Sequence, residues 1–202
     1  VELEDARAAL LFYTFRTESS VTHLRWENPA MAWEREIEVC RSVARAAGEL
    51  ALQHAARGVL REDKADDSPV TIADRECEQL IVSELRAAFP GDGFLGEEGA
   101  EHGGTSGRRW IVDPIDGTRD FVRGLPTWSN LIGLEVDGEV VLGTCNMVAQ
   151  GELYWAVRGE GAFVDDRRIH VSNIDRRDRA IACLTAFDNI AAAPFADRIL
   201  DH

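Results

Sequence analysis

A chain of 202 residues, of which 45% are apolar and 29% charged, can form one folded domain or one domain and part of another. This composition excludes a chain that is disordered throughout. The formal charge of −14 is spread along the sequence and argues against nucleic acid or an anionic membrane as a partner, because both would repel the protein. The four cysteines form no C-x-x-C pair, which argues against a zinc site, and no signal peptide is recognisable, so we expect a reduced, cytoplasmic protein.

The first half of the chain predicts two helices. Residues 1–30 show no clear period, and we expect them to be an extension upstream of the fold. Between residues 33 and 56 the apolar side chains recur at steps of three and four, which is the pattern of an amphipathic helix. Thr71 followed by Asp74 is typical of a helix N-cap and predicts a second helix that ends before Pro90.

The second half of the chain has the pattern of short β-strands. Five runs rich in β-branched and aromatic residues are Trp110–Val112, Leu131–Val136, Val140–Cys145, Leu153–Val157 and Ala162–Val164. Asp137-Gly138 lies between two of them and predicts a hairpin turn. Residues 180–202 predict one more strand and the beginning of a helix. Two helices followed by a series of strands predict an α+β domain built in layers.

An acidic string of six residues follows the first of these strands: Asp113-Pro114-Ile115-Asp116-Gly117-Thr118. Its two carboxylates are close enough in sequence to converge on a hard cation that prefers oxygen ligands, and the Ile115 carbonyl can face the same cation. Gly117 lets a phosphate oxygen approach the backbone, and a helix that begins near Thr118 would add N–H donors for an anion. An acidic turn is the alternative, since Asp and Gly are common in turns. The whole string favours a metal and phosphate centre.

Three further polar groups have a plain alternative when each is considered alone. Glu97 and Glu98 follow the short run Gly93–Leu95, and two adjacent carboxylates most often belong to a solvated loop. Asp74 lies at a predicted helix start, where a negative charge is favourable by roughly 0.3–1 kcal/mol. The Lys-Ala-Asp-Asp segment at residues 64–67 is by itself a polar loop.

Together and in this order, these strings resemble the inositol monophosphatase family. The resemblance rests on Lys64 with Ser68–Asp74, on Gly96–Glu98, on Trp110–Thr118, and on the glycine-containing hairpin Ala156–Phe163. It covers roughly residues 33–200 and implies the family's fold, an α+β sandwich with layers in the order α/β/α/β/α. It also implies a Mg²⁺-dependent phosphomonoesterase that hydrolyses a small phosphorylated metabolite with a metal-activated water, and no covalent phosphoenzyme.

The resemblance implies a set of metal ligands. Glu97, Asp113 and the carbonyl of Ile115 would hold a first Mg²⁺ ion. Asp113 and Asp116 would hold part of a second ion, and Glu97 would also lie near a third, weaker one.

The resemblance further implies catalytic and phosphate-binding residues. Asp74 and Thr118 would together orient and deprotonate the attacking water, with Glu97 as the third catalytic residue. The backbone N–H groups of Gly117 and Thr118 would receive the phosphate.

The segment Phe121–Trp128, which reads Phe-Val-Arg-Gly-Leu-Pro-Thr-Trp, bears on the substrate. It resembles the histidinol-phosphate phosphatases of the family more than the inositol phosphatases, which usually carry a histidine at or beside Arg123. Histidinol phosphate, an intermediate of histidine biosynthesis, is therefore the first expected substrate, with Arg123 in substrate binding. Inositol 1-phosphate is the alternative substrate, and a surface role is the alternative for Arg123. Asp120 departs from the usual Asn or Ser and would either repel the phosphate or contact a cationic substrate.

The C-terminal part departs from the family. A Gly-Ser-Ala-like loop and a Trp-Asp-x-Ala string, whose Asp completes the second metal site, have no match in residues 170–202. We therefore expect an extension at 1–30, an α+β metal and phosphate domain at 31–172, and at 173–202 the start of a truncated α/β domain whose layer is incomplete. A weak or inactive phosphatase and a non-enzymatic interaction protein are the alternatives to an active enzyme, and a homodimer stays open.

Overall fold

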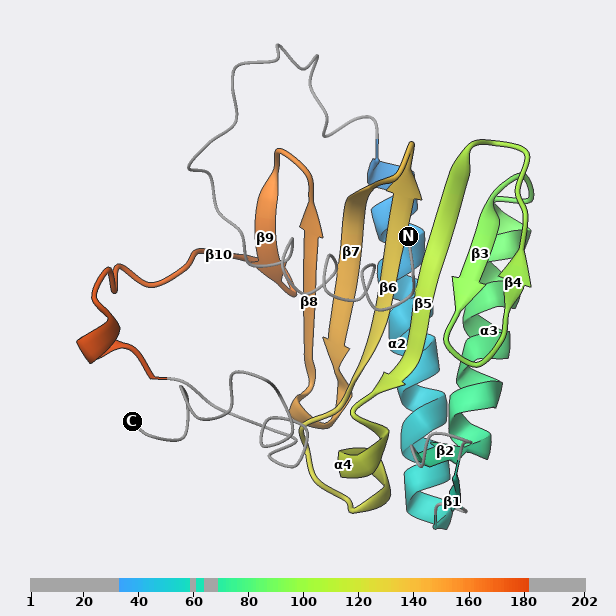
Figure 1. Cartoon of the computed structure of the whole chain (residues 1–202), viewed down its shortest axis with the longest axis horizontal. Coiled ribbons are helices and arrows are strands. Elements are labelled where there is room, and N and C mark those ends of the chain that lie inside the picture. Colours follow the sequence, from blue (N-terminus) through green and yellow to red (C-terminus); the bar gives the residue numbers. More distant parts are fainter. Residues whose placement is uncertain (1–32, 59–60, 64–68, 182–202) are drawn as a thin grey trace, which may run out of the picture. The chain divides into compact units, whose positions relative to one another are not determined.

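The computed structural model describes residues 33–58, 61–63 and 69–181 (Figure 1). The predictions for residues 1–30 and for the segment after residue 181 lie outside the described residues, as do Lys64 and Ser68. The chain divides into two compact units, Val1–His170 and Val171–His202. In the described part of the second unit, the regular structure is a single 3-10 turn, η3 (Arg177–Arg179).

Two long helices form where the sequence pattern predicts them. Helix α2 spans Glu34–Arg57 and helix α3 spans Ile72–Ala88. At the start of α3, the Thr71 hydroxyl accepts the Asp74 N–H at 3.4 Å, and the Asp74 carboxylate accepts the Thr71 N–H at 2.8 Å. This reciprocal capping satisfies N–H groups that have no partner inside the helix, and it confirms the predicted helix start. No helix in the described part of the chain is long and apolar enough to span a bilayer.

The strands form one large and one small sheet. The remaining elements of the first unit are β1 (Arg61–Asp63), β2 (Pro69–Thr71), β3 (Gly93–Gly96), β4 (Glu101–His102), β5 (Arg108–Asp116), α4 (Thr118–Val122), β6 (Ser129–Val136), β7 (Glu139–Met147), η2 (Val148–Gln150), β8 (Glu152–Val157), β9 (Gly161–Val164) and β10 (Arg167–Ile169). Strands β1 and β2 pair with each other, and the other eight form a sheet in the order β10-β9-β8-β7-β6-β5-β3-β4. All neighbours are antiparallel except β3 and β5, which run parallel. Asp137 and Gly138 both have positive φ angles, 52° and 81°, which confirms the predicted hairpin.

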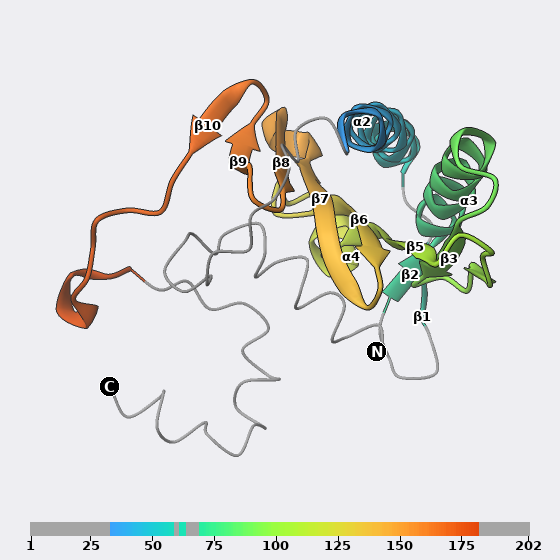
Figure 2. The same cartoon turned by 90° about the horizontal axis from the view of Figure 1, so that it is seen from above.

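Both long helices cover the same face of the large sheet (Figures 1 and 2). Helix α2 contacts β6 and β7, and α3 contacts β5. Small residues let α2 approach the sheet closely, because a Cβ atom added to Gly48 would lie 2.6 Å from Nδ2 of Asn146. The approach brings the Ala44 carbonyl to 2.8 Å from Asn146 Nδ2, which donates a hydrogen bond to it. The predicted α+β class is therefore confirmed, with helices layered on a sheet.

Two buried cysteines in this core have strongly raised thiol pKa values. Cys40 and Cys77 are both 0% exposed. Burial raises the pKa of the Cys40 thiol to about 12, against a smaller lowering by its hydrogen bond with Thr144. Burial, and then the charges of Asp74 and Glu76, raise the pKa of the Cys77 thiol to about 12. Both thiols are therefore protonated structural groups at neutral pH.

We expect iodoacetamide at pH 8 to leave Cys40 and Cys77 unmodified in the native protein. With a pKa of about 12 instead of 9.0, the reactive thiolate is roughly a thousandfold scarcer, and burial also blocks access. Peptide mass spectrometry after timed alkylation measures both sites. The same peptides labelled in concentrated urea are the control, and equal labelling rates in the native and unfolded proteins would contradict the buried placement.

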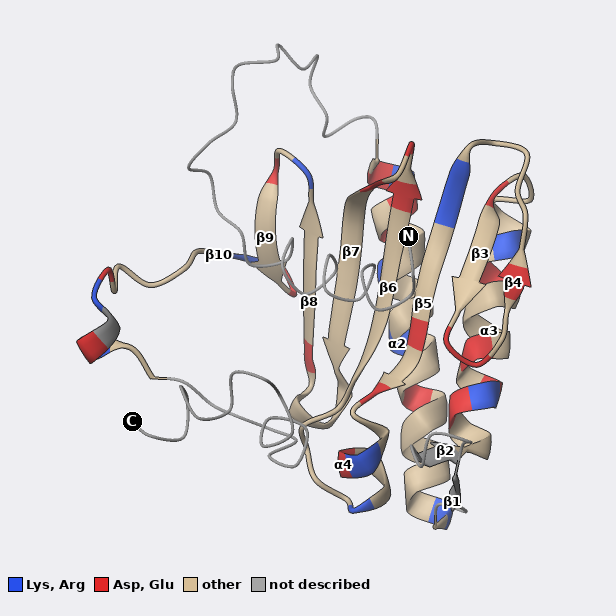
Figure 3. Ribbon diagram, in the orientation of Figure 1, with Lys and Arg blue, Asp and Glu red and all other residues tan. Residues whose placement is uncertain are grey.

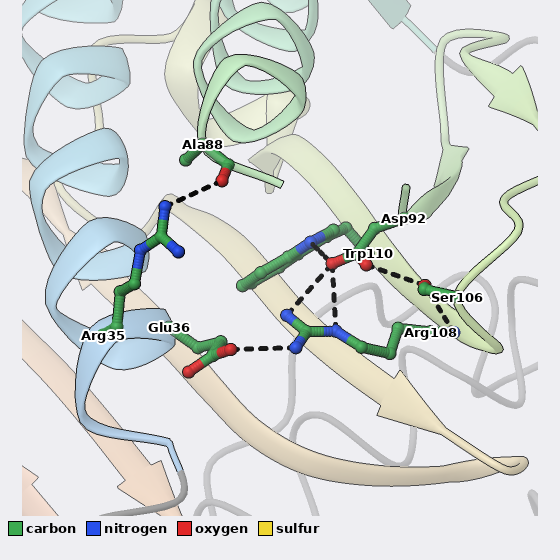
Figure 4. Close-up of polar contacts among 7 residues, drawn as sticks. All are labelled: Arg35, Glu36, Ala88, Asp92, Ser106, Arg108 and Trp110. Carbon is green, nitrogen blue, oxygen red and sulfur yellow. Dashed lines mark hydrogen bonds and ion pairs between the residues drawn. The ribbon is translucent and has the colours of Figure 1, made fainter. Parts of the chain in front are cut away.

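A buried ionic cluster ties the beginning of β5 to the turn before β3 (Figure 4). Asp92 is only 5% exposed and accepts hydrogen bonds from Trp110 Nε1 at 2.9 Å, Arg108 Nε at 3.1 Å and Ser106 Oγ at 2.8 Å. Arg108 also donates to Glu36 on α2 at 2.8 Å. The cluster therefore fixes the register of the two parallel strands and attaches α2 to them.

Replacing Asp92 by Ala is expected to lower the free energy of unfolding by about 3 kcal/mol, because it removes one partner of a buried ion pair. It leaves Arg108 and the Trp110 N–H without this acceptor. Urea unfolding measures the loss. The matched control is Asp166→Ala, which breaks an exposed pair with Arg41 whose Asp side chain is 94% exposed. The control should cost less than about 1 kcal/mol, and an equal loss in both variants would argue against a special role of the buried cluster.

Candidate metal and phosphate site

The acidic string begins inside strand β5 and ends in a tight turn. Strand β5 reaches Asp116, so it is longer than the apolar run predicted from the sequence. Its pairing with β6 shifts register between Asp113 and Asp116, which marks a local irregularity. Gly117 follows with φ +86°, and a Cβ atom there would lie 3.0 Å from the Thr127 carbonyl oxygen. Glycine adopts this conformation without strain and makes room for the Thr127 carbonyl. Helix α4 begins directly after it at Thr118, the position considered for a helix start in the sequence.

Asp74 and Thr118 meet although they are 44 positions apart in the sequence. The Thr118 hydroxyl lies 3.2 Å from Asp74 Oδ1 and 3.0 Å from the Ile115 carbonyl oxygen. A hydroxyl has one proton, so it donates to one of these two acceptors at a time. The other carboxylate oxygen of Asp74, Oδ2, accepts the Thr71 N–H at 2.8 Å and the Thr71 hydroxyl at 2.6 Å. The N-cap of α3 therefore orients the carboxylate so that Oδ1 is directed to Thr118.

Burial makes Asp74 a stronger base than an exposed aspartate. The residue is 1% exposed, and this burial raises the pKa of its carboxyl above the ordinary value, while hydrogen bonds from Thr71 and Thr118 lower it in part. A carboxylate with a raised pKa takes up a proton more readily near neutral pH. Asp74 thus has the environment of a general base.

Glu97 reaches the same region through the parallel pairing of β3 with β5. Gly96 pairs with Val112, so Glu97 and Asp113 are the residues that follow this last pair, Glu97 just after the end of β3 and Asp113 still on β5. The Glu97 N–H donates to the Val112 carbonyl at 3.1 Å, which continues this register beyond the end of β3. Figure 3 shows acidic positions both on β5 and in the loop between β3 and β4. The carboxyl ends of parallel strands are a common place for ligands.

The oxygen ligands predicted from the sequence are of the type that Mg²⁺ binds, but their side chains are not arranged around a common point. Asp113 is 3% exposed, and Glu97 and Asp116 are half-buried. Within the described ranges, no three His, Cys, Asp or Glu side chains are arranged to hold a metal ion. The pairing of β3 with β5 brings the backbone of Glu97 beside that of Asp113, and Asp116 follows three positions later on β5. Carboxylate and carbonyl oxygens, the latter from Ile115, fit a hard cation such as Mg²⁺.

Two buried asparagines support the acidic string, and the sequence reasoning missed both. Asn130 is 0% exposed and donates through Nδ2 to the carbonyl oxygen of Pro114. Asn146 donates to Asn130 Oδ1 at 3.2 Å and to the Ala44 carbonyl of α2. The chain of amides connects α2 to the acidic string through β6 and β7. The available signal was an amide side chain within each of two strongly apolar strands, where an unpaired polar group is costly.

Arg123 and Asp120, which were considered for substrate recognition, belong to α4 and its end. Arg123 is exposed, and its guanidinium donates to the Arg119 carbonyl at 3.0 Å. The Asp120 carboxylate accepts a hydrogen bond from the Thr127 hydroxyl. These contacts stabilise the short helix and the loop after it, and a role of Arg123 in substrate binding stays a prediction.

The helices layered on a mixed sheet, with carboxylates at the end of its parallel strand pair, define an α+β sandwich with an acidic strand-end site. The sequence matches the inositol monophosphatase family over residues 32–195. The chain belongs to the inositol monophosphatase family, which confirms the family expected from its motifs.

Individual relatives carry different names. A histidinol-phosphatase from Chlorobaculum parvum is 42% identical over 160 residues, which cover 79% of this chain and 62% of the relative. An inositol-1-monophosphatase from Mesorhizobium japonicum is 47% identical over 116 residues, which cover 56% of this chain and 44% of the relative. The solved structure of the extragenic suppressor protein suhB from Bartonella henselae is similar with a TM-score of 0.67 and 37% identity, over 70% of this chain and 56% of that one. The chain therefore spans less than two thirds of the length of these relatives.

Proposed function

We propose that this chain carries the metal- and phosphate-binding part of a Mg²⁺-dependent phosphomonoesterase. The observation that carries the proposal is the hydrogen-bonded group of Asp74, Thr118 and the Ile115 carbonyl at the end of β5. Glu97 and Asp113 follow paired positions of the neighbouring strands. A buried carboxylate and a hydroxyl are thus hydrogen-bonded beside the end of β5, which also carries oxygen atoms of the kind that bind Mg²⁺; a metal-dependent phosphatase uses groups of these types.

In this proposal Asp74 and Thr118 handle the proton of the attacking water. The Thr118 hydroxyl passes its proton to Asp74 Oδ1 as it takes one from the water. Thr71 holds the opposite oxygen of Asp74 and keeps the carboxylate in this orientation. The raised pKa of Asp74 favours its uptake of the proton.

Glu97, Asp113, Asp116 and the Ile115 carbonyl would hold Mg²⁺. The bound ion would supply positive charge that lowers the pKa of the attacking water and offsets the charge on the phosphate oxygens. The N–H groups of Gly117 and Thr118, at the beginning of α4, would donate to the phosphate. The positive φ of Gly117 turns the chain there, and its lack of a Cβ atom makes room for the backbone of Thr127 and Trp128.

Histidinol phosphate is the proposed substrate, with histidinol as the product. Support comes from the histidinol-phosphatase of Chlorobaculum parvum, which aligns over 79% of this chain. The segment Phe121–Trp128, with Arg123 in place of the histidine typical of inositol phosphatases, favours the same substrate. The inositol-1-monophosphatase of Mesorhizobium japonicum, 47% identical over a shorter stretch, supports inositol 1-phosphate as the second candidate.

The test is the release of inorganic phosphate from histidinol phosphate and from inositol 1-phosphate, each with and without Mg²⁺. The proposal expects release that depends on Mg²⁺ and is faster for histidinol phosphate. Faster release from inositol 1-phosphate would make that compound the preferred substrate, and the proposed reaction class would stand. If neither compound releases phosphate in a Mg²⁺-dependent way at high protein concentration, the result would contradict an active enzyme. It would favour the alternative of an inactive member of the family.

A further inference from the structure

Helix α3 carries two buried carboxylates one turn apart, and only the first has a place in the proposed chemistry. Asp74 is 1% exposed and Glu78 is 4% exposed. Residues four apart lie on the same face of a helix. The two carboxylates on this face therefore contact different segments. Asp74 contacts Thr118, and Glu78 contacts the loop after β3.

Glu78 binds the backbone of the loop 96–100 at two points. Its Oε2 accepts the Glu98 N–H at 2.7 Å, and its Oε1 accepts the Ala100 N–H at 2.9 Å. Hydrogen bonds of this kind, from backbone N–H groups to an ionised carboxylate, are about twice as strong as those between neutral groups. A further bond, from the Gly96 N–H to the Ala100 carbonyl at 2.7 Å, closes the same loop.

Gly96 is the residue that lets Glu78 come so close. A Cβ atom added to Gly96 would lie 2.3 Å from Glu78 Oε2 and 2.5 Å from its Cδ. Any side chain at position 96 would therefore displace the carboxylate or the loop. The close approach of Glu78 therefore explains why the Gly-Glu-Glu string begins with a glycine in this structure.

Glu97 is the second residue of this loop, between Gly96 and the Glu98 N–H that Glu78 accepts. Its own N–H is bonded to the Val112 carbonyl of β5, and the residue after it is bonded to Glu78. The backbone of Glu97 is therefore held from the strand on one side and from α3 on the other.

We propose that Glu78 is a positioning residue that sets the direction of the Glu97 carboxylate toward the metal site. The inference rests on the proposed function, because it gives Glu97 the role of a metal ligand. Helix α3 thus carries the proton-accepting Asp74 and, through Glu78, also holds the loop that carries Glu97. A purely structural Glu78 would stabilise the loop without affecting metal affinity.

The test compares Mn²⁺ affinity and amide exchange in the 202-residue chain and its variants. Glu78→Gln retains the shape but leaves one acceptor oxygen for two N–H groups. We expect the Mn²⁺ dissociation constant to rise about tenfold, as for other residues that orient metal ligands, and the Glu98 and Ala100 amides to exchange faster. Glu84→Gln removes the same charge from an exposed position of α3 and should change neither quantity.

Gly96→Ala is the second variant, because it displaces the carboxylate without removing its charge. It should weaken Mn²⁺ binding in the same direction as Glu78→Gln, with the far-UV circular dichroism spectrum retained. Unchanged Mn²⁺ affinity in both variants would overturn the positioning role. If the unmodified chain binds no Mn²⁺ at all, the proposed function fails, and the exchange of the two amides still decides whether Glu78 holds the loop.

Discussion

Replacing Asp113 by Asn is expected to lower Mg²⁺-dependent phosphate release by roughly a thousandfold, since losing a metal ligand removes several kcal/mol of transition-state stabilisation. Asn has nearly the same volume, and Asp113 is buried on β5, so the change removes charge and leaves the packing in place. Release is measured at saturating histidinol phosphate over a range of Mg²⁺ concentrations.

The matched control for this variant is Asp137→Asn. Asp137 is exposed in the β6–β7 hairpin and has a positive φ angle of 52°, a conformation that Asn adopts well. The Asp137→Asn variant removes the same charge at a position outside the string Asp113–Thr118, and it should leave phosphate release unchanged. Equal activity of the Asp113 and Asp137 variants would remove Asp113 from the reaction.

Thr118→Val and Asp74→Asn are expected to lower the turnover number by about a hundredfold to ten-thousandfold each, the range for loss of a general base or its relay. The hydroxyl and the carboxylate are 3.2 Å apart and act on one proton in the proposed reaction. The double variant should therefore be no slower than the slower single variant. Steady-state kinetics of the four proteins measures this coupling.

Measuring metal binding distinguishes the proton-transfer pair, Asp74 and Thr118, from the proposed metal ligands. Thr118→Val should still bind Mn²⁺, whereas Asp113→Asn should not. Thr105→Val, in an exposed part of the β4–β5 loop, is the control for a Thr to Val change and should be fully active. Effects of the two single variants that multiply in the double variant would show that Asp74 and Thr118 act independently, against a shared proton path.

Local patterns in the sequence predicted most of the secondary structure. The steps of three and four in α2 and the capping pair of α3 are local signals, and the structure confirms both elements. The Asp137-Gly138 turn and the five predicted strands are confirmed for the same reason. The parallel pairing of β3 with β5 was not predicted, because pairing between distant segments depends on the whole fold and leaves no local pattern.

The candidate site was predictable only in part. The meeting of Asp74 with Thr118 agrees with the resemblance that placed them together. The support from Asn130 and Glu78 was not predicted, since a buried polar side chain finds its partner through tertiary packing. Glu78 did leave a signal, because it falls on the apolar face of α3 next to Cys77 and Ile81, where a carboxylate requires donors.

The measurement that tests the central claim most directly is a titration of the chain with Mn²⁺, followed by electron paramagnetic resonance of the free ion. A protein with a formal charge of −14 attracts cations without any site, so the variants matter more than the binding itself. We expect saturable binding in the unmodified protein and in Asp137→Asn, and its loss in Asp113→Asn. Equal binding by Asp113→Asn and Asp137→Asn would contradict a metal centre in the string from Asp113 to Thr118.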